Sequence, residues 1–211
     1  MDWANRMAEL VEDWNFLYHR DGARATLSAI MTDITRLPYR RLNFLVFARS
    51  LLEPLPDFQP KIPIEIRPFE AGDLKFVREL VLPSEAKLFE ARLANNHTGL
   101  IGFFQGQPVG YAWGSPKIDP AIERFHTSLE EGDVLCVDAF TVPAFRGKGV
   151  QTALTLARCS LFCDLGYRRA IAYIEKHNHP SSSVWRKIGA QQIGEIVFER
   201  IGPWRRSFYV R

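Results

Sequence analysis

The sequence has few cysteines and no long apolar run, and both absences narrow the class of protein. Its three cysteines, Cys136, Cys159 and Cys163, are odd in number and lie in apolar stretches, which predicts reduced thiols rather than a disulfide framework. No apolar run approaches the roughly 20 residues of a membrane-spanning helix. The first residues also lack the basic and then apolar pattern of a secretory signal. We therefore expect a cytoplasmic protein.

Charge of one sign, repeats and metal ligands are also scarce. The 27 basic and 24 acidic residues leave a net charge of +3, too mild to indicate a nucleic-acid partner. No internal repeat is present. Cys159 and Cys163 share a face of an expected helix, but no His or second cysteine pair accompanies them, so core packing is favoured over a metal site. A chain of 211 residues with 46% hydrophobic content suits one domain plus an appendage.

The most informative stretch runs from Asp133 to Gly166. Residues 134–142 are rich in β-branched and apolar side chains, as in a strand buried on both faces, and Pro143 prevents the strand from continuing. From Gly149 the apolar residues recur at helical spacing until Gly166, a favourable C-terminal cap. The basic, glycine-rich turn at residues 146–149 therefore opens a helix, whose free amides favour an anion, most simply a phosphate.

This strand, turn and helix resemble the acyl-CoA signature of the GNAT superfamily of N-acyltransferases. Arg146 and Gly149 match its pattern, and Gln151 occupies a last position that is Gly or Ala in the family. A second family motif is matched by Asn178, Lys187 and Gly189. The resemblance covers residues 62–211 and implies an α+β fold with a central mixed sheet flanked by helices.

The remaining elements arrive in the order that this resemblance requires. We expect strands at 64–68, 98–104, 108–114, 168–174, 190–200 and 205–210, and helices at 73–82, 84–95 (capped by Ser84) and 181–188. The segment 115–132 is expected to be a loop that contacts the acceptor or only connects two strands.

The resemblance implies acetyl-CoA or another acyl-CoA as co-substrate, without a metal. The expected cleft lies where the central strand parts from the next one. Pantetheine would pair with the backbone of Phe140, Thr141 and Val142, and the other implied cofactor contacts are Phe145, Arg146, Gly147, Lys148, Gly149, Val150 and Gln151 at the pyrophosphate, with Asn178 and Trp185 further along.

Asp138 is the first candidate for a general base, directly or through water. It interrupts an apolar strand just before the expected cleft and matches an acidic position of the family. The alternative is a carboxylate that pairs with an arginine and orients the acceptor ammonium without taking its proton. Glu175 and His177, after the following strand, are the next candidates.

Trp185 occupies a position where many family members have a tyrosine that protonates the leaving thiolate. Indole supplies no usable acid. A water, a serine among residues 181–183, or no acid at all would then serve, since a thiol with a pKa near 8.5 leaves as a thiolate. Trp185 would otherwise pack in the core or form a wall that selects the acyl group.

The first 53 residues lie outside the resemblance and are expected to form two helices and a short strand at 42–48, followed by a proline-rich linker at 54–61 and the acyltransferase domain at 62–211. Arg36, Arg40, Arg41 and Arg49 form a basic window that contains Phe44 and Phe47. It either contacts a membrane surface or an acyl carrier protein, or its arginines are simply solvated while the helices pack on a neighbour.

The sequence thus predicts an N-acyltransferase that transfers an acetyl group to a primary amine on a small molecule or peptide, by direct attack in a ternary complex. Two alternatives stay open: transfer of a longer acyl chain from acyl-CoA or an acyl carrier protein, and a catalytically silent acyl-CoA-binding or partner-binding module. A P-loop nucleotidase is disfavoured because Lys148 is followed by Gly rather than Ser or Thr.

Overall fold

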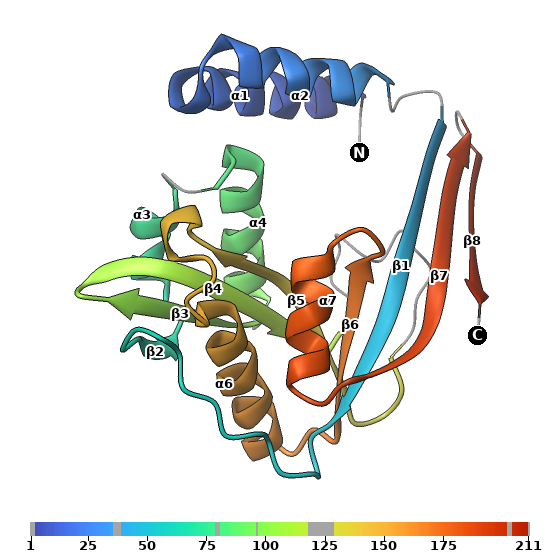
Figure 1. Ribbon diagram of the computed structural model, residues 1–211. Helices are drawn as coiled ribbons and strands as arrows, with labels where there is room; N and C mark the ends of the chain where they lie inside the picture. The colour runs from blue at the N-terminus through green and yellow to red at the C-terminus, as the bar shows by residue number, and fades with distance from the viewer. Residues whose placement is uncertain are drawn as a thin grey trace. The chain divides into compact units, whose positions relative to one another are not determined.

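The fold is built on an eight-stranded mixed sheet, in a computed structural model that describes residues 3–35, 39–78, 81–95, 97–117, 129–201 and 204–210. The strand order is β2-β3-β4-β5-β6-β1-β7-β8 (Figure 1). The strands are β1 (Tyr39–Ser50), β2 (Glu65–Pro68), β3 (Thr98–Phe104), β4 (Gln107–Ser115), β5 (Asp133–Thr141), β6 (Arg169–Glu175), β7 (Gln191–Ile201) and β8 (Trp204–Val210). A mixed sheet with helices confirms the expected α+β class.

The chain forms two compact units. The first comprises Met1–Arg40, Glu70–Asn96 and Arg200–Trp204, and the second comprises Arg41–Phe69, His97–Glu199 and Arg205–Arg211. The first unit holds α1 (Trp3–Asp21), α2 (Ala23–Thr35), the 3-10 turn η1 (Ala71–Asp73), α3 (Leu74–Val77) and α4 (Pro83–Ala94). The second holds most of the sheet, the 3-10 turn η2 (Pro143–Phe145), α6 (Val150–Asp164) and α7 (His179–Lys187). No helix of the described ranges is both long and apolar enough to cross a membrane.

Helices α6 and α7 cover one face of the central strands. Cys159 and Phe162 of α6 and Trp185 of α7 share a buried cluster with alternate residues of β5, β6 and β1, among them Cys136, Ala172 and Phe47. Alternation along a strand directs the intervening residues to the opposite face. One face of these strands is therefore covered by α6 and α7, and the residues in between point to the other face.

The strand expected at 42–48 belongs to this sheet rather than to an N-terminal extension. β1 pairs antiparallel with β6, from Phe44↔Glu175 to Ser50↔Arg169. Leu45, Val46 and Phe47 are all buried, as expected for a strand covered on both faces. A domain boundary at 54–61 therefore does not separate all elements of residues 1–53 from the sheet.

Helix boundaries also differ from the sequence prediction, and α7 begins two residues earlier than the expected start at Ser181. The helix expected at 73–82 starts as η1 and reaches only Val77 in α3, and Leu82 is extended because the residue before a proline disfavours the helical region. Ser84 does not cap α4, because Leu82 is the N-cap and Pro83 is the first helical residue. The Leu82 amide instead donates to Glu85 Oε2 at 3.0 Å.

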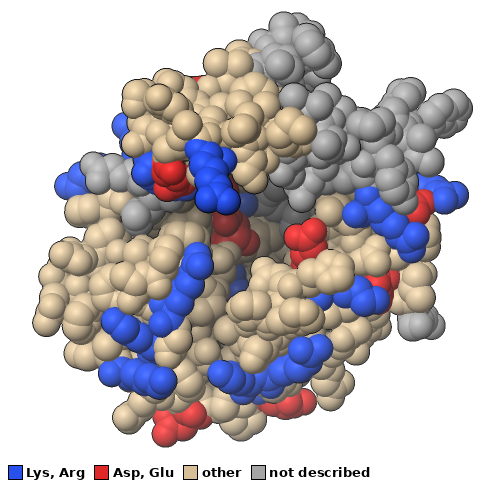
Figure 2. All heavy atoms as spheres, turned by 45° about the horizontal axis from the view of Figure 1, so that its top comes forward, with Lys and Arg blue, Asp and Glu red and all other residues tan. Residues whose placement is uncertain are grey.

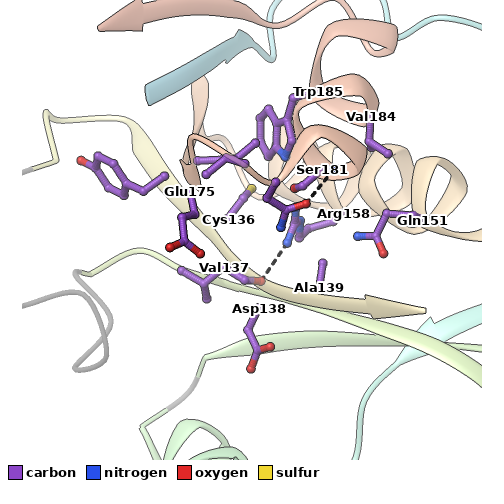
Figure 3. A pocket seen from close by; sticks show the side chains of 14 residues that line it. Cys136, Val137, Asp138, Ala139, Gln151, Arg158, Glu175, Ser181, Val184 and Trp185 are labelled. Carbon is purple, nitrogen blue, oxygen red and sulfur yellow. Dashed lines mark hydrogen bonds between the residues drawn. The ribbon is translucent and has the colours of Figure 1, made fainter. Parts of the chain in front are cut away.

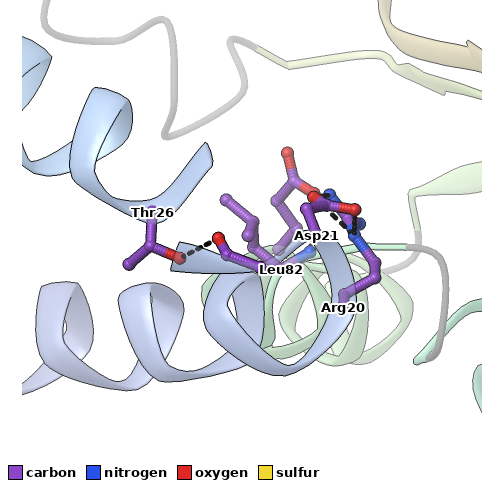
Figure 4. Close-up of polar contacts among 6 residues, drawn as sticks. Arg20, Asp21, Thr26 and Leu82 are labelled. Atoms are coloured by element: carbon purple, nitrogen blue, oxygen red, sulfur yellow. Dashed lines mark hydrogen bonds and ion pairs between the residues drawn. The ribbon is translucent and has the colours of Figure 1, made fainter. Parts of the chain in front are cut away.

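Polar contacts connect residues within the first unit, and Figure 4 shows those around the junction of α1 and α2. Gly22, at φ +83°, separates α1 from α2, and its carbonyl accepts a hydrogen bond from Thr26 Oγ1 at 3.1 Å. Arg20 pairs with Asp21 at 2.7 Å and lowers the pKa of that carboxyl. Nearer the middle of α1, the Asp13 carboxylate accepts hydrogen bonds from the Ser84 amide and hydroxyl at 3.2 and 2.8 Å, so Ser84 links α4 to α1.

Candidate active site

The two parallel strands at the centre of the sheet separate partway along their length. β5 and β6 pair at Asp133↔Arg169, Val134↔Ala170 and Leu135↔Ile171, and their ladder ends there although both strands continue. At the paired end Arg169 Nε and NH2 donate to the two Asp133 oxygens at 2.7 and 2.8 Å, which raises the pKa of Arg169. The separation confirms the cleft expected between these strands and leaves one edge of β5 available to a ligand.

A β-bulge at Asp138 lies just beyond the point of separation. Ala112 pairs with Ala139 and Trp113 pairs with Val137, so Asp138 has no ladder partner in β4. Its φ of +41° is unusual for a residue other than glycine, and this strain places the carboxylate at the cleft. The Asp138 side chain points to the side of β5 opposite Arg158 (Figure 3).

A cavity of about 230 Å³ occupies the space between the separated strands and the two helices. Predicted site residues among its lining are Asp138, Glu175, Gln151, Asn178 and Trp185. Alternation on β6 sends Glu175 to the face away from α6 and α7, because Ala172 and Ile174 pack under those helices. The cleft therefore has two carboxylates on one face of the sheet and the helix residues on the other.

The predicted anion site is a turn with free backbone amides. The amides of residues 147–151 donate to no backbone carbonyl in the described part of the chain, and they precede or open α6. Gly147 and Gly149 adopt φ values of +73° and +88°. The side chains of Arg146 and Lys148 add positive charge at the same turn. This arrangement suits a diphosphate.

Two residues of this region have roles that the sequence did not predict. Gln151, in place of the small residue of the family pattern, accepts a hydrogen bond from Thr141 Oγ1 at 3.0 Å and so joins α6 to β5. The Val142 amide donates to the Val109 carbonyl at 2.9 Å and is therefore not free to pair with pantetheine. The part of β5 that borders the cavity is instead residues 136–139.

The other predicted cofactor residues contribute through packing or backbone. Phe140 stacks on Tyr111 with ring centroids 5.6 Å apart, and Phe145 packs edge-on against Phe104 at 5.9 Å. Val150 is 1% exposed, so only its backbone is available. These side chains shape the turn rather than line the cavity.

In the region of the second motif, Asn178 caps a helix and Trp185 lines the cavity. Asn178 is the N-cap of α7, and its side chain accepts from the Ser181 amide at 3.1 Å. Trp185 is 3% exposed and closes the helix side of the cavity. His177 is exposed and is not one of the lining residues. The structure thus brings Asp138 and Glu175, but not His177, to the cleft.

Arg158 is a cavity residue that the sequence analysis missed. It belongs to α6 and is 2% exposed, and its NH1 donates to the carbonyls of Trp113 and Val137 at 2.7 and 3.1 Å. A single arginine within an apolar helical run was the only available signal. Burial of a long charged side chain is rare unless it is paired, so this arginine requires an explanation.

Replacing Gly149 with alanine should weaken coenzyme A binding and lower the free energy of unfolding by about 1–3 kcal/mol. A Cβ at Gly149 would lie 2.9 Å from Phe58 Cζ and 3.1 Å from Pro60 Cα, in addition to the strain of φ +88°. Gly147→Ala is the matched control, because φ is also positive there but nothing lies within 4 Å. Denaturant unfolding should show the larger loss for Gly149→Ala, and equal losses would contradict the contact with Phe58 and Pro60.

Native thiol reactivity should separate the three cysteines. Burial raises the pKa of Cys136, and it raises the pKa of Cys159 to about 12, whereas Cys163 is exposed. At a pH of about 8, a thiol with a pKa of 12 is thiolate in roughly one molecule in 10,000. A thiol reagent should therefore modify Cys163 alone before unfolding. Rapid native modification of Cys159 would contradict this placement.

Part of the basic window at residues 36–49 is buried rather than exposed, and the side chain of Arg40 is not among those that the structure describes. Arg36 lies outside the described residues. Arg49 is 4% exposed and bonds Glu53 and the Pro54 carbonyl, Arg41 pairs with Glu199, and Phe47 is fully buried. Figure 2 shows basic and acidic side chains interspersed on one face of the molecule. The charge near any point of that face therefore depends on the nearest side chains.

Comparisons with known proteins agree with this geometry. A GCN5-related N-acetyltransferase from Sphaerobacter thermophilus superposes with a TM-score of 0.56 and 17% identity, over 86% of this chain and 57% of that one. A Drosophila protein superposes with a TM-score of 0.57 and 15% identity, over 84% and 57%. These matches show the fold, and this chain spans less than two thirds of either structure.

In sequence, 97 residues are 32% identical to a mycothiol acetyltransferase from Saccharomonospora viridis, which is 44% of this chain and 30% of that protein. The model of the acetyltransferase (GNAT) family matches residues 65–190, more than half of the chain, and this range contains the separated strands, the bulge and the amide turn. The chain therefore belongs to the GNAT acetyltransferase family.

Proposed function

We propose that this protein is an acyl-CoA-dependent N-acyltransferase that transfers an acetyl group from acetyl-CoA to a primary amine. The observation that carries the proposal is the separation of β5 from β6 after Leu135 and Ile171, beside the free amides of residues 147–151. A thioester chain needs an open strand edge, and a diphosphate needs a cluster of amide donors. Both lie next to one cavity.

Coenzyme A is held mainly by backbone. Its diphosphate binds the amides of residues 147–151, with Arg146 and Lys148 as counter-charges. Its pantetheine lies along the free edge of β5, and Gln151 and Asn178 line the same space. Backbone recognition of this kind fixes the thioester carbon in one place, and positioning supplies much of the rate enhancement in such a reaction.

The acceptor approaches from the carboxylate face of the sheet. Asp138 and Glu175 both line the cleft on the side away from α6 and α7, and they attract a cationic amine. Asp138 then removes the proton that the amine must lose, directly or through water, as nitrogen attacks the thioester carbon. Nitrogen gains the acyl group, the carbon–sulfur bond breaks, and coenzyme A leaves.

A thiol-release assay tests this function. Purified protein is incubated with acetyl-CoA and a panel of small amines, amino sugars, peptide N termini and lysine peptides. Acceptor-dependent release of coenzyme A, with a matching mass increase of the acceptor, supports the proposal. Binding of coenzyme A with no turnover on any acceptor would instead favour a silent binding module, the alternative that Trp185 in the tyrosine position suggests.

The same assay with other donors tests the length of the acyl chain. Preference for acetyl-CoA over long-chain acyl-CoA and acyl carrier protein supports acetyl transfer. Preference for a carrier-bound donor would overturn it. Burial of Arg49 and Phe47 leaves the window at residues 36–49 with less exposed basic and aromatic surface for such a carrier.

A further inference from the structure

Arg158 is a buried cation that pairs with no carboxylate in the part of the chain that the structure describes. Its NH1 donates to two backbone carbonyls, and its Nε is buried without a hydrogen-bond partner among the described residues. A buried guanidinium normally needs a counter-charge and full hydrogen bonding. The deficit at Arg158 therefore points to an anion that is present only at some stage of the reaction.

The guanidinium is fixed beside the cavity rather than mobile. Its two carbonyl partners, on Trp113 and Val137, form the last ladder pair before the bulge at Asp138. Its Cζ lies 5.9 Å from the centre of the Trp185 ring, within range of a cation–π contact. Figure 3 shows Arg158 between β5 and α7, on the opposite side of β5 from Asp138. A charge fixed in this way needs no reorganisation when an anion develops next to it.

We propose that Arg158 stabilises the departing coenzyme A thiolate, in place of a general acid. The proposal rests on the N-acyltransferase function above. As the new carbon–nitrogen bond forms, the amine proton passes to Asp138 or its water. The carbon–sulfur bond then breaks, its electron pair stays on sulfur, and the thiolate leaves beside the guanidinium and takes a proton from solvent after release. Trp185 supplies no proton, so a fixed positive charge replaces the missing acid.

Two buried cysteine thiols lie close enough to Arg158 to feel its charge. Burial raises the pKa of Cys136 and of Cys159, and the Arg158 charge opposes the increase at both thiols. Cys136 also lines the cavity. A coenzyme A thiol that enters the cavity experiences the same positive charge.

A titration of bound coenzyme A tests the proposal without any substitution. The ultraviolet absorbance of the thiolate is followed against pH in the complex with coenzyme A, with the desulfo-coenzyme A complex as the blank for the protein's own thiols. We expect the pKa of the bound thiol to lie about 1–3 units below its free value of about 8.5. A bound-thiol pKa at or above the free value overturns the proposal while leaving the acyltransferase function intact.

Variants separate a charge effect from a structural one. Arg158→Met should return the bound-thiol pKa to the free value or above it and lower kcat by about 100-fold, whereas Arg158→Lys should keep part of the shift. Trp185→Tyr in the Arg158→Met background should restore part of the rate by supplying a proton. Arg186→Met is the control, because Arg186 also contacts an aromatic ring, Phe47 at 5.4 Å, but does not line the cavity.

Three outcomes bear directly on the proposed role of Arg158. If Arg158→Met binds coenzyme A with the wild-type thiol pKa and turns over at the wild-type rate, Arg158 has no leaving-group role. If Arg158→Met unfolds, the wild-type titration alone decides. If wild-type protein does not bind coenzyme A at all, the proposed function fails first and this inference fails with it.

Discussion

Asp138→Asn should lower kcat by about 10²–10⁴-fold while leaving coenzyme A affinity nearly unchanged. Asparagine keeps the size of the side chain and tolerates the positive φ of +41° at this bulge, so the local backbone should persist. It removes the carboxylate that we propose as the acceptor of the amine proton. Steady-state kinetics with a saturating acceptor, alongside calorimetric titration with coenzyme A, measure the two effects separately.

Two neighbouring substitutions serve as controls for this prediction. Glu175→Gln removes the other cleft carboxylate and should raise the acceptor KM more than it lowers kcat, since the role we propose for Glu175 is attraction of the cationic acceptor. His177→Asn should change neither parameter, because His177 is exposed and lies outside the cavity lining. A large kcat loss in Glu175→Gln with normal turnover in Asp138→Asn would transfer the base role to Glu175.

Gly114→Val should lower the free energy of unfolding by about 3 kcal/mol or more, among the largest effects expected of overpacking. A Cβ at Gly114 would overlap with Phe162 Cε2 and lie 2.5 Å from Phe162 Cζ, with the Leu135 carbonyl at 3.3 Å. Phe162 is 1% exposed, so its ring has no room to move aside. Denaturant unfolding monitored by circular dichroism measures the loss.

A second substitution checks the cause of that loss. Phe162→Leu removes the ring edge, so the double variant should be less destabilised than the sum of the two single variants. Gly72→Ala is the control, since nothing lies within 4 Å of its added Cβ and its φ is not positive. Full additivity of Gly114→Val and Phe162→Leu would show that the predicted contact does not cause the effect.

Most elements of the acyltransferase region could be predicted because their signals are local. Pro143 ends β5, Gly149 and Gly166 flank α6 in positive-φ conformations, and the turn at residues 105–106 joins β3 to β4. Each signal depends on the backbone preferences of a few adjacent residues. The order of these elements, together with the motif at Arg146 and Gly149, was enough to indicate the family fold.

Features set by distant partners could not be predicted in the same way. The strand at 42–48 was expected, but its place between β6 and β7 depends on segments more than 100 residues away. Nothing in the residues around Asp138 indicates that β4 skips it, and nothing around Arg158 indicates that carbonyls of two strands surround its guanidinium. These tertiary contacts give the cleft most of its chemistry.

The proposed binding of acyl-CoA requires a diphosphate site at the amides of residues 147–151, next to the point where β5 and β6 separate. Calorimetric titration of the wild-type protein with coenzyme A and with pantetheine, which lacks the phosphates, tests it most directly. We predict a micromolar-range Kd for coenzyme A and binding at least about tenfold weaker for pantetheine. Equal affinities, or no binding of coenzyme A, would contradict the account.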